Sequence, residues 1–473
     1  MPAISVFDML KIGVGPSSSH TLGPWRAVQR WLKELENDVN LDEVTHIQIA
    51  LYGSLALTGR GHCTDKAVSL ALLGYDPVTV PVEEIEAILN DLRDKKFISL
   101  GNGRDIPFDP DTDIWYQTRE KLPFHANGMR CIATVGETSY KGTYYSVGGG
   151  FVVKDGETEE GTDEVQLPYP CEISNQLLGH CQTQNFAIAD MVHANELTWR
   201  TEAEIKAHLM QIWQVMKEGL YRGCHTDGTL PGGLQVTRRA KGISSKLLDG
   251  TVAPDPDAWI QLIRSRNFNF RQTLKWVSCF ALAVNEENAS LGRVVTAPTN
   301  GAAGVIPAVL MYHVCFAEEE VTDGDIAKYL MVAGEIGTFF KKRATISAAM
   351  GGCQAEIGVS SAMAAAALTE IQGGTVAQSL MAAEIAMEHH LGLTCDPIKG
   401  LVQVPCIERN SMGAIKAINA AALALEGNPQ EAKVSLDDVI QTMWETAKDM
   451  NSKYKETSQG GLAVNISVRV PEC

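Results

Sequence analysis

The sequence lacks the features that mark exported, membrane-spanning and nucleic-acid-binding proteins. Its first 20 residues contain no basic stretch followed by an apolar one, and no run of about 18 apolar residues occurs anywhere. We therefore expect neither a signal peptide nor a transmembrane helix. The net charge of −17 argues against the clustered Lys and Arg that nucleic acid requires. These absences predict a soluble, cytoplasmic protein that binds neither nucleic acid nor a membrane.

Closely spaced cysteine pairs are also missing. Without a C-x-x-C pair the chain is no ordinary zinc finger, and without a C-x₂-C-x₂-C run it is no ferredoxin. The 11 cysteines are odd in number, which in a reducing compartment favours free thiols, metal ligands or catalytic groups over disulfides. Cys131, Cys224, Cys279 and Cys315 lie in apolar or helical patterns, so we predict that they are small buried hydrophobes.

The first third of the chain has mixed helical and strand patterns. Apolar residues recur at helical spacing over 21–36 and alternate with polar ones over 46–52, and further strands are predicted at 132–138 and 143–153. A chain of 473 residues is expected to form two or three domains. We predict that residues 1–155 form an α+β domain.

The composition then changes. Residues 156–171 are acidic and end near two prolines, which is typical of a linker. Beyond them, helical patterns rich in Ala, Gly, Ser and Met dominate, as at 347–370, 378–390 and 414–425. The chain is therefore predicted to be an α+β N-terminal domain followed by a larger all-α helical catalytic domain, 172–473.

Four cysteines in the second half stand apart from the buried group. Cys353, Cys395 and Cys406 lie among Gly, Pro and residues at helix ends, and Cys473 is the last residue. Three dispersed thiolates could hold a cluster within a large fold and leave one metal position open, as catalytic sites do. Unrelated buried cysteines would give the same spacing, so the spacing alone leaves both interpretations open.

Several long motifs resemble those of the bacterial iron–sulfur L-serine dehydratases of the single-chain type. They follow one another in the same order over nearly the whole chain, at residues 15–24, 53–67, 298–307, 348–358, 389–410 and 455–465. The resemblance implies a lyase that converts L-serine to pyruvate and ammonia. It also implies that Cys353, Cys395 and Cys406 bind a [4Fe–4S] cluster. By the same resemblance, Cys473 would reach back and occupy the open iron until serine displaces it.

His62 is the candidate catalytic base. It ends the turn Gly59-Arg60-Gly61-His62, and an unperturbed imidazole titrates near physiological pH. A surface or helix-capping histidine is the ordinary interpretation of such a residue, and the resemblance is what favours the base. Position 63 is Cys, where we would expect a small residue such as Gly.

Two further segments are candidates for substrate contact. Ser18, Ser19, His20 and Thr21 precede a helix, where hydroxyls cap free N–H groups and the same geometry can bind a carboxylate. Asn300 lies in a Gly-rich segment that opens another helix, and it could contact substrate or cluster or belong only to close helix packing.

Other functions remain open at this point. A pyridoxal-phosphate dehydratase would need a Schiff-base lysine with a Gly-rich phosphate loop, and the nearest candidate, Lys246, has no such loop beside it. An iron–sulfur hydro-lyase acting on a hydroxy acid and an amino-acid sensor are further alternatives. We expect a homodimer with its site between the domains. Whether the N-terminal domain has a separate allosteric serine site is left open.

Overall fold

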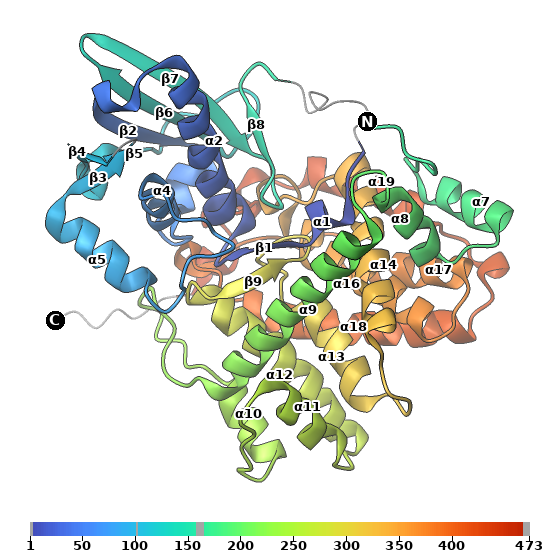
Figure 1. Cartoon of the computed structure of the whole chain (residues 1–473). Coiled ribbons are helices and arrows are strands. Elements are labelled where there is room, and N and C mark those ends of the chain that lie inside the picture. Colours follow the sequence, from blue (N-terminus) through green and yellow to red (C-terminus); the bar gives the residue numbers. More distant parts are fainter. Residues whose placement is uncertain (1–2, 101–102, 158–164, 467–473) are drawn as a thin grey trace.

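The chain folds into a sheet-containing N-terminal part and a larger, mostly helical C-terminal part (Figure 1). The structure, a computed structural model, describes residues 3–100, 103–157 and 165–466. The predicted fold class is thereby confirmed. Among the described residues, no helix combines the length and the apolar character that crossing a bilayer requires. Association into a homodimer stays a prediction.

The N-terminal part is built on a five-stranded sheet in the order β5-β2-β6-β7-β8, with β2 parallel to β5 and antiparallel to β6. On β2, Ile47, Ile49 and Leu51 are fully buried, and they share a core with Trp25 and Val28 of helix α2. The elements of this part are α1 Val6–Met9, β1 Lys11–Val14, α2 Gly23–Asp38, β2 Val44–Tyr52, α3 Ser54–Thr58, α4 Thr64–Leu72, α5 Ile85–Lys95, β3 Phe97–Leu100, β4 Arg104–Pro107, α6 Pro110–Asp113, β5 Ile114–Gln117, β6 Gly128–Val135, β7 Thr138–Ser146 and β8 Val152–Lys154.

Two boundaries in this part differ from the predicted ones. The strands predicted at 132–138 and 143–153 are displaced, because the chain reverses at Gly136, where φ is +58°, and joins β6 to β7 as a hairpin. The helix predicted from residue 21 begins as a π-helical turn, Ser18–Leu22, and continues as α2 from Gly23. Such π-helical turns occur often at functional sites.

The C-terminal part is a helical bundle around α16, a helix rich in alanine. Ala362 and Ala364 to Ala367 are all fully buried there, so neighbouring helices can approach closely, as the small residues predicted. The elements of this part are α7 Ser174–Gln184, α8 Ile188–Glu196, α9 Glu202–His225, α10 Ala240–Leu247, α11 Pro256–Arg264, α12 Phe270–Ala289, β9 Arg293–Thr296, α13 Val305–Phe316, α14 Asp323–Arg343, α15 Ala348–Gly351, α16 Ile357–Ile371, α17 Val376–Glu388, α18 Cys406–Glu426, α19 Leu436–Asp449 and α20 Leu462–Asn465.

The single helix predicted over 347–370 is wrong. The chain breaks between α15 and α16 because Gly352 has φ +72° and ψ −170°, a backbone conformation that L side chains rarely adopt. A Cβ at this position would also lie 2.7 Å from the carbonyl oxygen of Leu393. The break puts Cys353 in a tight turn rather than on a continuous helix.

The alternating residues at 462–470 predict a strand from the sequence, and over the described part of this run that prediction is wrong. Residues Leu462–Asn465 form the short helix α20, which follows a turn at Gly461 with φ +56°. The backbone N–H of Leu462 donates to the carboxylate of Asp396 (2.5 Å), so this segment is held by a side chain and not by a neighbouring strand. Cys473 lies outside the described residues.

The first residues of the chain are tied into the helical part. Strand β1 pairs antiparallel with β9, and Val6, Met9 and Leu10 belong to the helical core. The buried carboxylate of Glu196 accepts hydrogen bonds from Ser5 Oγ (2.9 Å) and from the backbone N–H of Val6 (2.8 Å). These contacts anchor the chain immediately before the serine-rich turn, which is therefore placed between the two parts.

This anchor can be tested with Glu196→Ala. The change leaves two buried donors without an acceptor, and each is expected to cost about 1–3 kcal/mol of folding free energy. We expect a lower thermal midpoint and faster proteolysis near the N-terminus. Glu202→Ala removes a carboxylate that is 72% exposed and serves as the control. Equal midpoints for the two variants would show that the anchor contributes nothing.

Candidate active site

Three cysteines of the helical part gather in one buried cluster. Cys353 follows the turn at Gly352, Cys395 lies in the loop after α17, and Cys406 is the first residue of α18. Donor atoms of Cys353, Cys395 and Glu356 lie within 4.8 Å of one another, which is compatible with a metal site. Burial raises the pKa of Cys406, and the nearby Cys353 thiol raises it further. The fold thus brings together residues that are 53 positions apart in the sequence.

Arg409 supplies positive charge to this cluster from the first turns of α18. Its guanidinium donates to Cys353 Sγ (3.1 Å) and to the carbonyl oxygen of Thr394 (2.5 Å), and it lies 3.5 Å from Asp396 Oδ1. The hydrogen bond from Cys395, together with Arg409, lowers the pKa of Cys353 against the effect of burial. A half-buried cation beside three thiols favours their thiolate forms, which are the forms that bind metal.

The C-terminal segment wraps around the Cys395 loop. The backbone N–H of Cys395 donates to the carbonyl oxygen of Tyr454 (2.8 Å), and the N–H of Glu456 donates to the carbonyl oxygen of Cys395 (2.9 Å). Ser458 Oγ adds a hydrogen bond to the carbonyl oxygen of Pro397 (2.7 Å). This pairing carries the Glu456 side chain toward residues of the N-terminal part.

Glu456 lies between the cysteine cluster and two histidines, and it was not predicted from the sequence. Its Oε1 is 3.5 Å from His62 Nε2 and 3.7 Å from His20 Nδ1, and the residue is only 3% exposed. Burial, followed by the nearby Glu356 carboxyl, raises the pKa of Glu456 well above its usual range. The motif at 455–465 contained this acid, but an isolated Glu beside a Lys gives no sign of burial.

His62 is buried and held in one orientation. Its Nδ1 is 3.0 Å from the carbonyl oxygen of Thr58, which can only accept, so Nδ1 carries the proton and Nε2 has a free lone pair. The imidazole stacks on His20 with ring centroids 4.5 Å apart. Burial lowers the pKa of His62 to about 4, so the ring is neutral at pH 7. The next residue, Cys63, has φ +56°, which accounts for the glycine expected there.

The serine-rich turn is fully buried against His62. Ser17 Oγ caps the turn by accepting from the backbone N–H of His20 (3.1 Å), and Ser19 Oγ lies 2.8 Å from His20 Nδ1. Thr21 Oγ1 donates to the carbonyl oxygen of His62 (2.7 Å), so it positions the His62 loop. Ser18, at the start of the turn, is 2% exposed. The turn and the candidate base therefore form one unit.

Asn300 is buried nearby in a different set of contacts. Its amide donates to the carbonyl oxygen of Val14 (3.2 Å) and lies 3.3 Å from Asn288 Oδ1, while its own Oδ1 accepts from Thr296 (2.8 Å). These bonds occupy the amide within the β1–β9 junction. Contact between Asn300 and a substrate stays a prediction.

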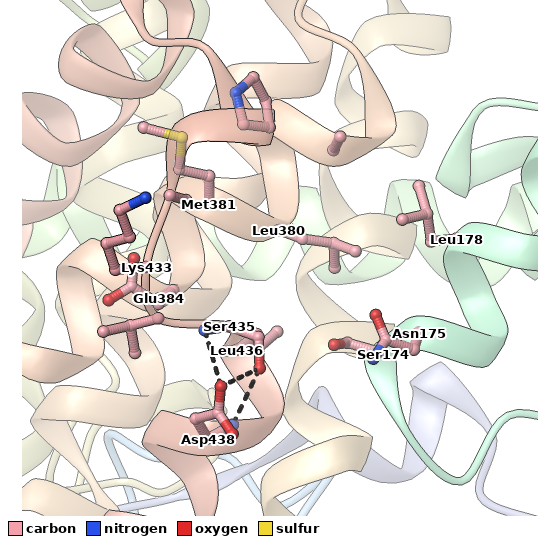
Figure 2. Close-up of a pocket in the computed structure, with 14 residues that line it drawn as sticks. Ser174, Asn175, Leu178, Leu380, Met381, Glu384, Lys433, Ser435, Leu436 and Asp438 are labelled. Atoms are coloured by element: carbon pink, nitrogen blue, oxygen red, sulfur yellow. Dashed lines mark hydrogen bonds between the residues drawn. The ribbon is translucent and has the colours of Figure 1, made fainter.

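A separate surface groove is a weaker candidate. It has a volume of about 240 Å³ and lies between α7, α17 and the start of α19 (Figure 2). Its Ser435 and Asp438 side chains cap α19 and are hydrogen-bonded to each other (2.7 Å). The groove shares no residue with the thiols or with the buried histidines, so we place the site at the cysteine cluster.

Comparison with known proteins decides the family. A model of the serine dehydratase beta chain matches residues 5–157, and a model of the serine dehydratase alpha chain matches residues 183–463. The chain belongs to the serine dehydratase family. It is 45% identical over 467 residues to L-serine dehydratase 1 of Escherichia coli (strain K12) and 48% identical over 469 residues to L-serine dehydratase of Streptomyces coelicolor, covering 98% of this chain and 99% of each relative. The L-serine dehydratase of Helicobacter pylori is 43% identical over 473 residues, 98% of this chain and all of the relative.

In this member of the serine dehydratase family, the residues of the site are divided between the two matched regions. His20 and His62 come from the beta-chain match, whereas the three cysteines and Glu456 come from the alpha-chain match. The hydrogen bond from Ser54 Oγ to the carbonyl oxygen of Glu456 (3.0 Å) joins the two parts directly. Closure of the site therefore depends on the contact between them.

The charge of Arg409 can be tested with Arg409→Met. The change keeps much of the side-chain volume but removes the cation beside the thiols, so we expect a large loss of bound metal in anaerobically purified protein, measured by elemental analysis. Arg239→Met is the matched control, because Arg239 is 41% exposed and pairs with Glu408 at the surface. Full metal retention in Arg409→Met would contradict this role.

Proposed function

We propose that this chain is an L-serine dehydratase that converts L-serine to pyruvate and ammonia, with a [4Fe–4S] cluster held by Cys353, Cys395 and Cys406. The observation that carries the proposal is the juxtaposition of three buried thiols with a buried, neutral imidazole. The curated relatives are named for this activity and match almost the full chain. The enzyme is accordingly a lyase.

The residues present fit such a cluster. Thiolates are the ligands that iron–sulfur clusters prefer, and the three sulfurs are buried beside a guanidinium that offsets their negative charge. Ala302, Ala348 and Ile357 pack against Cys353 and Cys395 and exclude water from the sulfurs. When bound, the cluster supplies a Lewis-acidic iron that can accept the hydroxyl and a carboxylate oxygen of serine.

His62 is the base in this proposal. Its Nε2 lone pair is available because Nδ1–H is engaged by Thr58, and it faces the side of the site where Glu456 lies. It takes the α-proton of serine as the β-hydroxyl departs as hydroxide, which leaves the enamine of pyruvate, and the proton held by His62 then converts the hydroxide to water. Tautomerisation and hydrolysis of that enamine release ammonia and consume one water. Because Thr58 and Thr21 hold the ring and its backbone, little reorientation is needed.

The serine-rich turn binds the substrate in this proposal. Ser18 and Ser19 lie at the first positions of a helical turn, where backbone N–H groups are without partners in the helix and favour an anion such as a carboxylate. His20 is oriented by its neighbours. Ser54 Oγ donates to the carbonyl oxygen of Glu456 and so accepts from His20 Nε2 (3.0 Å). Ser19 Oγ then donates to His20 Nδ1.

The alternatives are less well supported. A pyridoxal-phosphate enzyme would need a buried lysine beside a phosphate loop, and Lys246 is exposed on α10. A sensor without turnover has no need of a neutral imidazole beside the thiols. The hydroxy-acid hydro-lyase differs only in its substrate. Cys473 as a ligand of the open iron stays a prediction.

The base is tested with His62→Asn. We expect kcat for pyruvate formation to fall by about 10²- to 10⁴-fold while the iron content and the KM for L-serine change little, because the change removes the proton acceptor alone. His180→Asn is the control, since His180 is half-buried on α7 and contacts Pro170 and Tyr169 rather than residues of the site. A wild-type rate in His62→Asn would exclude it as the base.

The pH dependence gives a second test of the same residue. Because burial lowers the pKa of His62 to about 4, the ring stays in its base form as the pH falls through the ordinary imidazole value of about 6.5. We expect the acid limb of kcat/KM to lie below 6.5. As the pH falls, His62 takes up its proton in the unfolded chain before it does so in the folded protein. The contribution of the neutral ring to the free energy of unfolding is therefore complete above pH 6.5 and declines as the pH falls toward 4. An acid limb above 6.5 would contradict the burial of the base.

A further inference from the structure

The carboxyl of Glu456 is incompletely satisfied in a buried position. Its Oε2 makes no well-formed hydrogen bond among the described residues, although the side chain is almost fully buried and the backbone of Ala349 lies close to the carboxyl. Burying a polar atom without a partner costs free energy, so such atoms in a site usually meet a ligand. Ser347, two residues before Ala349, likewise has an Oγ without a partner among the described residues. The region therefore offers hydrogen-bond acceptors to a ligand.

The charges around Glu456 lack a matching cation. The basic side chains within 4 Å of its carboxyl, in the described part of the chain, are the imidazoles of His20 and His62. Burial keeps both imidazoles neutral at pH 7, so neither supplies a positive charge. The Glu356 carboxyl and the Cys353 thiol also lie near Glu456, and neither can serve as its cation. The guanidinium of Arg409, at the cysteine cluster, is already engaged with Cys353 and Asp396. A small organic cation would complete this set of charges.

We propose that Glu456 recognises the α-ammonium group of the substrate and so selects an amino acid over the corresponding hydroxy acid. This inference rests on the proposed function and names the residue that determines its substrate class. An ammonium group donates three hydrogen bonds, and the free Oε2 of Glu456 is an acceptor for one of them. A hydroxy acid brings no cation, so it would leave this buried carboxyl without an ionic partner.

The position of Glu456 also couples recognition to chemistry. Its Oε1 lies 3.5 Å from Nε2 of His62, the atom with the free lone pair. The nitrogen of an amino acid is one bond from the α-carbon. An ammonium held by Glu456 therefore places the α-proton next to the base, whereas the serine-rich turn takes the carboxylate. By holding the ammonium nitrogen, Glu456 thus positions the adjacent bond between the α-carbon and its hydrogen, which is the bond that breaks.

The test compares two ligands that differ in the ammonium group alone. These are L-serine, assayed by pyruvate formation, and 3-hydroxypropanoate, measured as a competitive inhibitor of that reaction. In Glu456→Gln we expect KM for L-serine to rise about 10- to 150-fold, because a charge-assisted hydrogen bond is lost. We expect Ki for 3-hydroxypropanoate to change less than about threefold. Glu445→Gln, an exposed carboxylate on α19, is the matched control and should change neither value.

Several outcomes would overturn the inference. A fall in kcat with an unchanged KM would make Glu456 a partner of His62 rather than of the substrate, and equal weakening of both ligands would remove its selectivity. If Glu456→Gln loses its iron, Glu456→Asp replaces it, and that variant should show a smaller rise in KM with the same selectivity. Wild-type protein that makes no pyruvate from L-serine would instead refute the proposed function itself.

Discussion

Two backbone hydrogen bonds between Cys395 and the C-terminal segment are the contacts on which the site depends. They join the N–H of Cys395 to Tyr454 and the N–H of Glu456 to Cys395, at 2.8 and 2.9 Å. One loop thereby presents a thiol to the cluster of cysteines, and its neighbour presents a carboxyl to His20 and His62. Without this pairing, the acid would have no reason to be buried and the two parts of the chain would share fewer contacts.

Burial sets the chemistry of the assembled groups. The same loss of solvation lowers the pKa values of His20 and His62 and raises those of Glu456 and Cys406. Imidazoles thus stay neutral at physiological pH, as a base must be, while the acids depend on a nearby cation to become charged. A site built in this way favours a ligand that brings its own positive charge. This dependence on burial also explains why the contacts of Glu196 with Ser5 and Val6 matter, since any opening between the two parts of the chain would admit water.

Much of this arrangement could be predicted from the sequence, but its decisive contacts could not. The division into an α+β part and a helical part followed from the change in periodicity, and long motifs pointed to the three cysteines and to His62. The break at Gly352 was missed because an alanine-rich pattern continues on both sides of it. Glu456 was missed because its burial arises from backbone pairing with a loop 61 residues away, which no local pattern records.

The most direct measurement is the iron and sulfide content of anaerobically purified protein, together with pyruvate formation from L-serine, in wild type, Cys395→Ser and Cys315→Ser. Cys315 is buried in the helical core, outside the cysteine cluster, and serves as the control. We expect about four irons per chain and serine-dependent pyruvate in wild type and in Cys315→Ser. Both should be lost in Cys395→Ser. Pyruvate formation by protein that contains no iron would contradict the account.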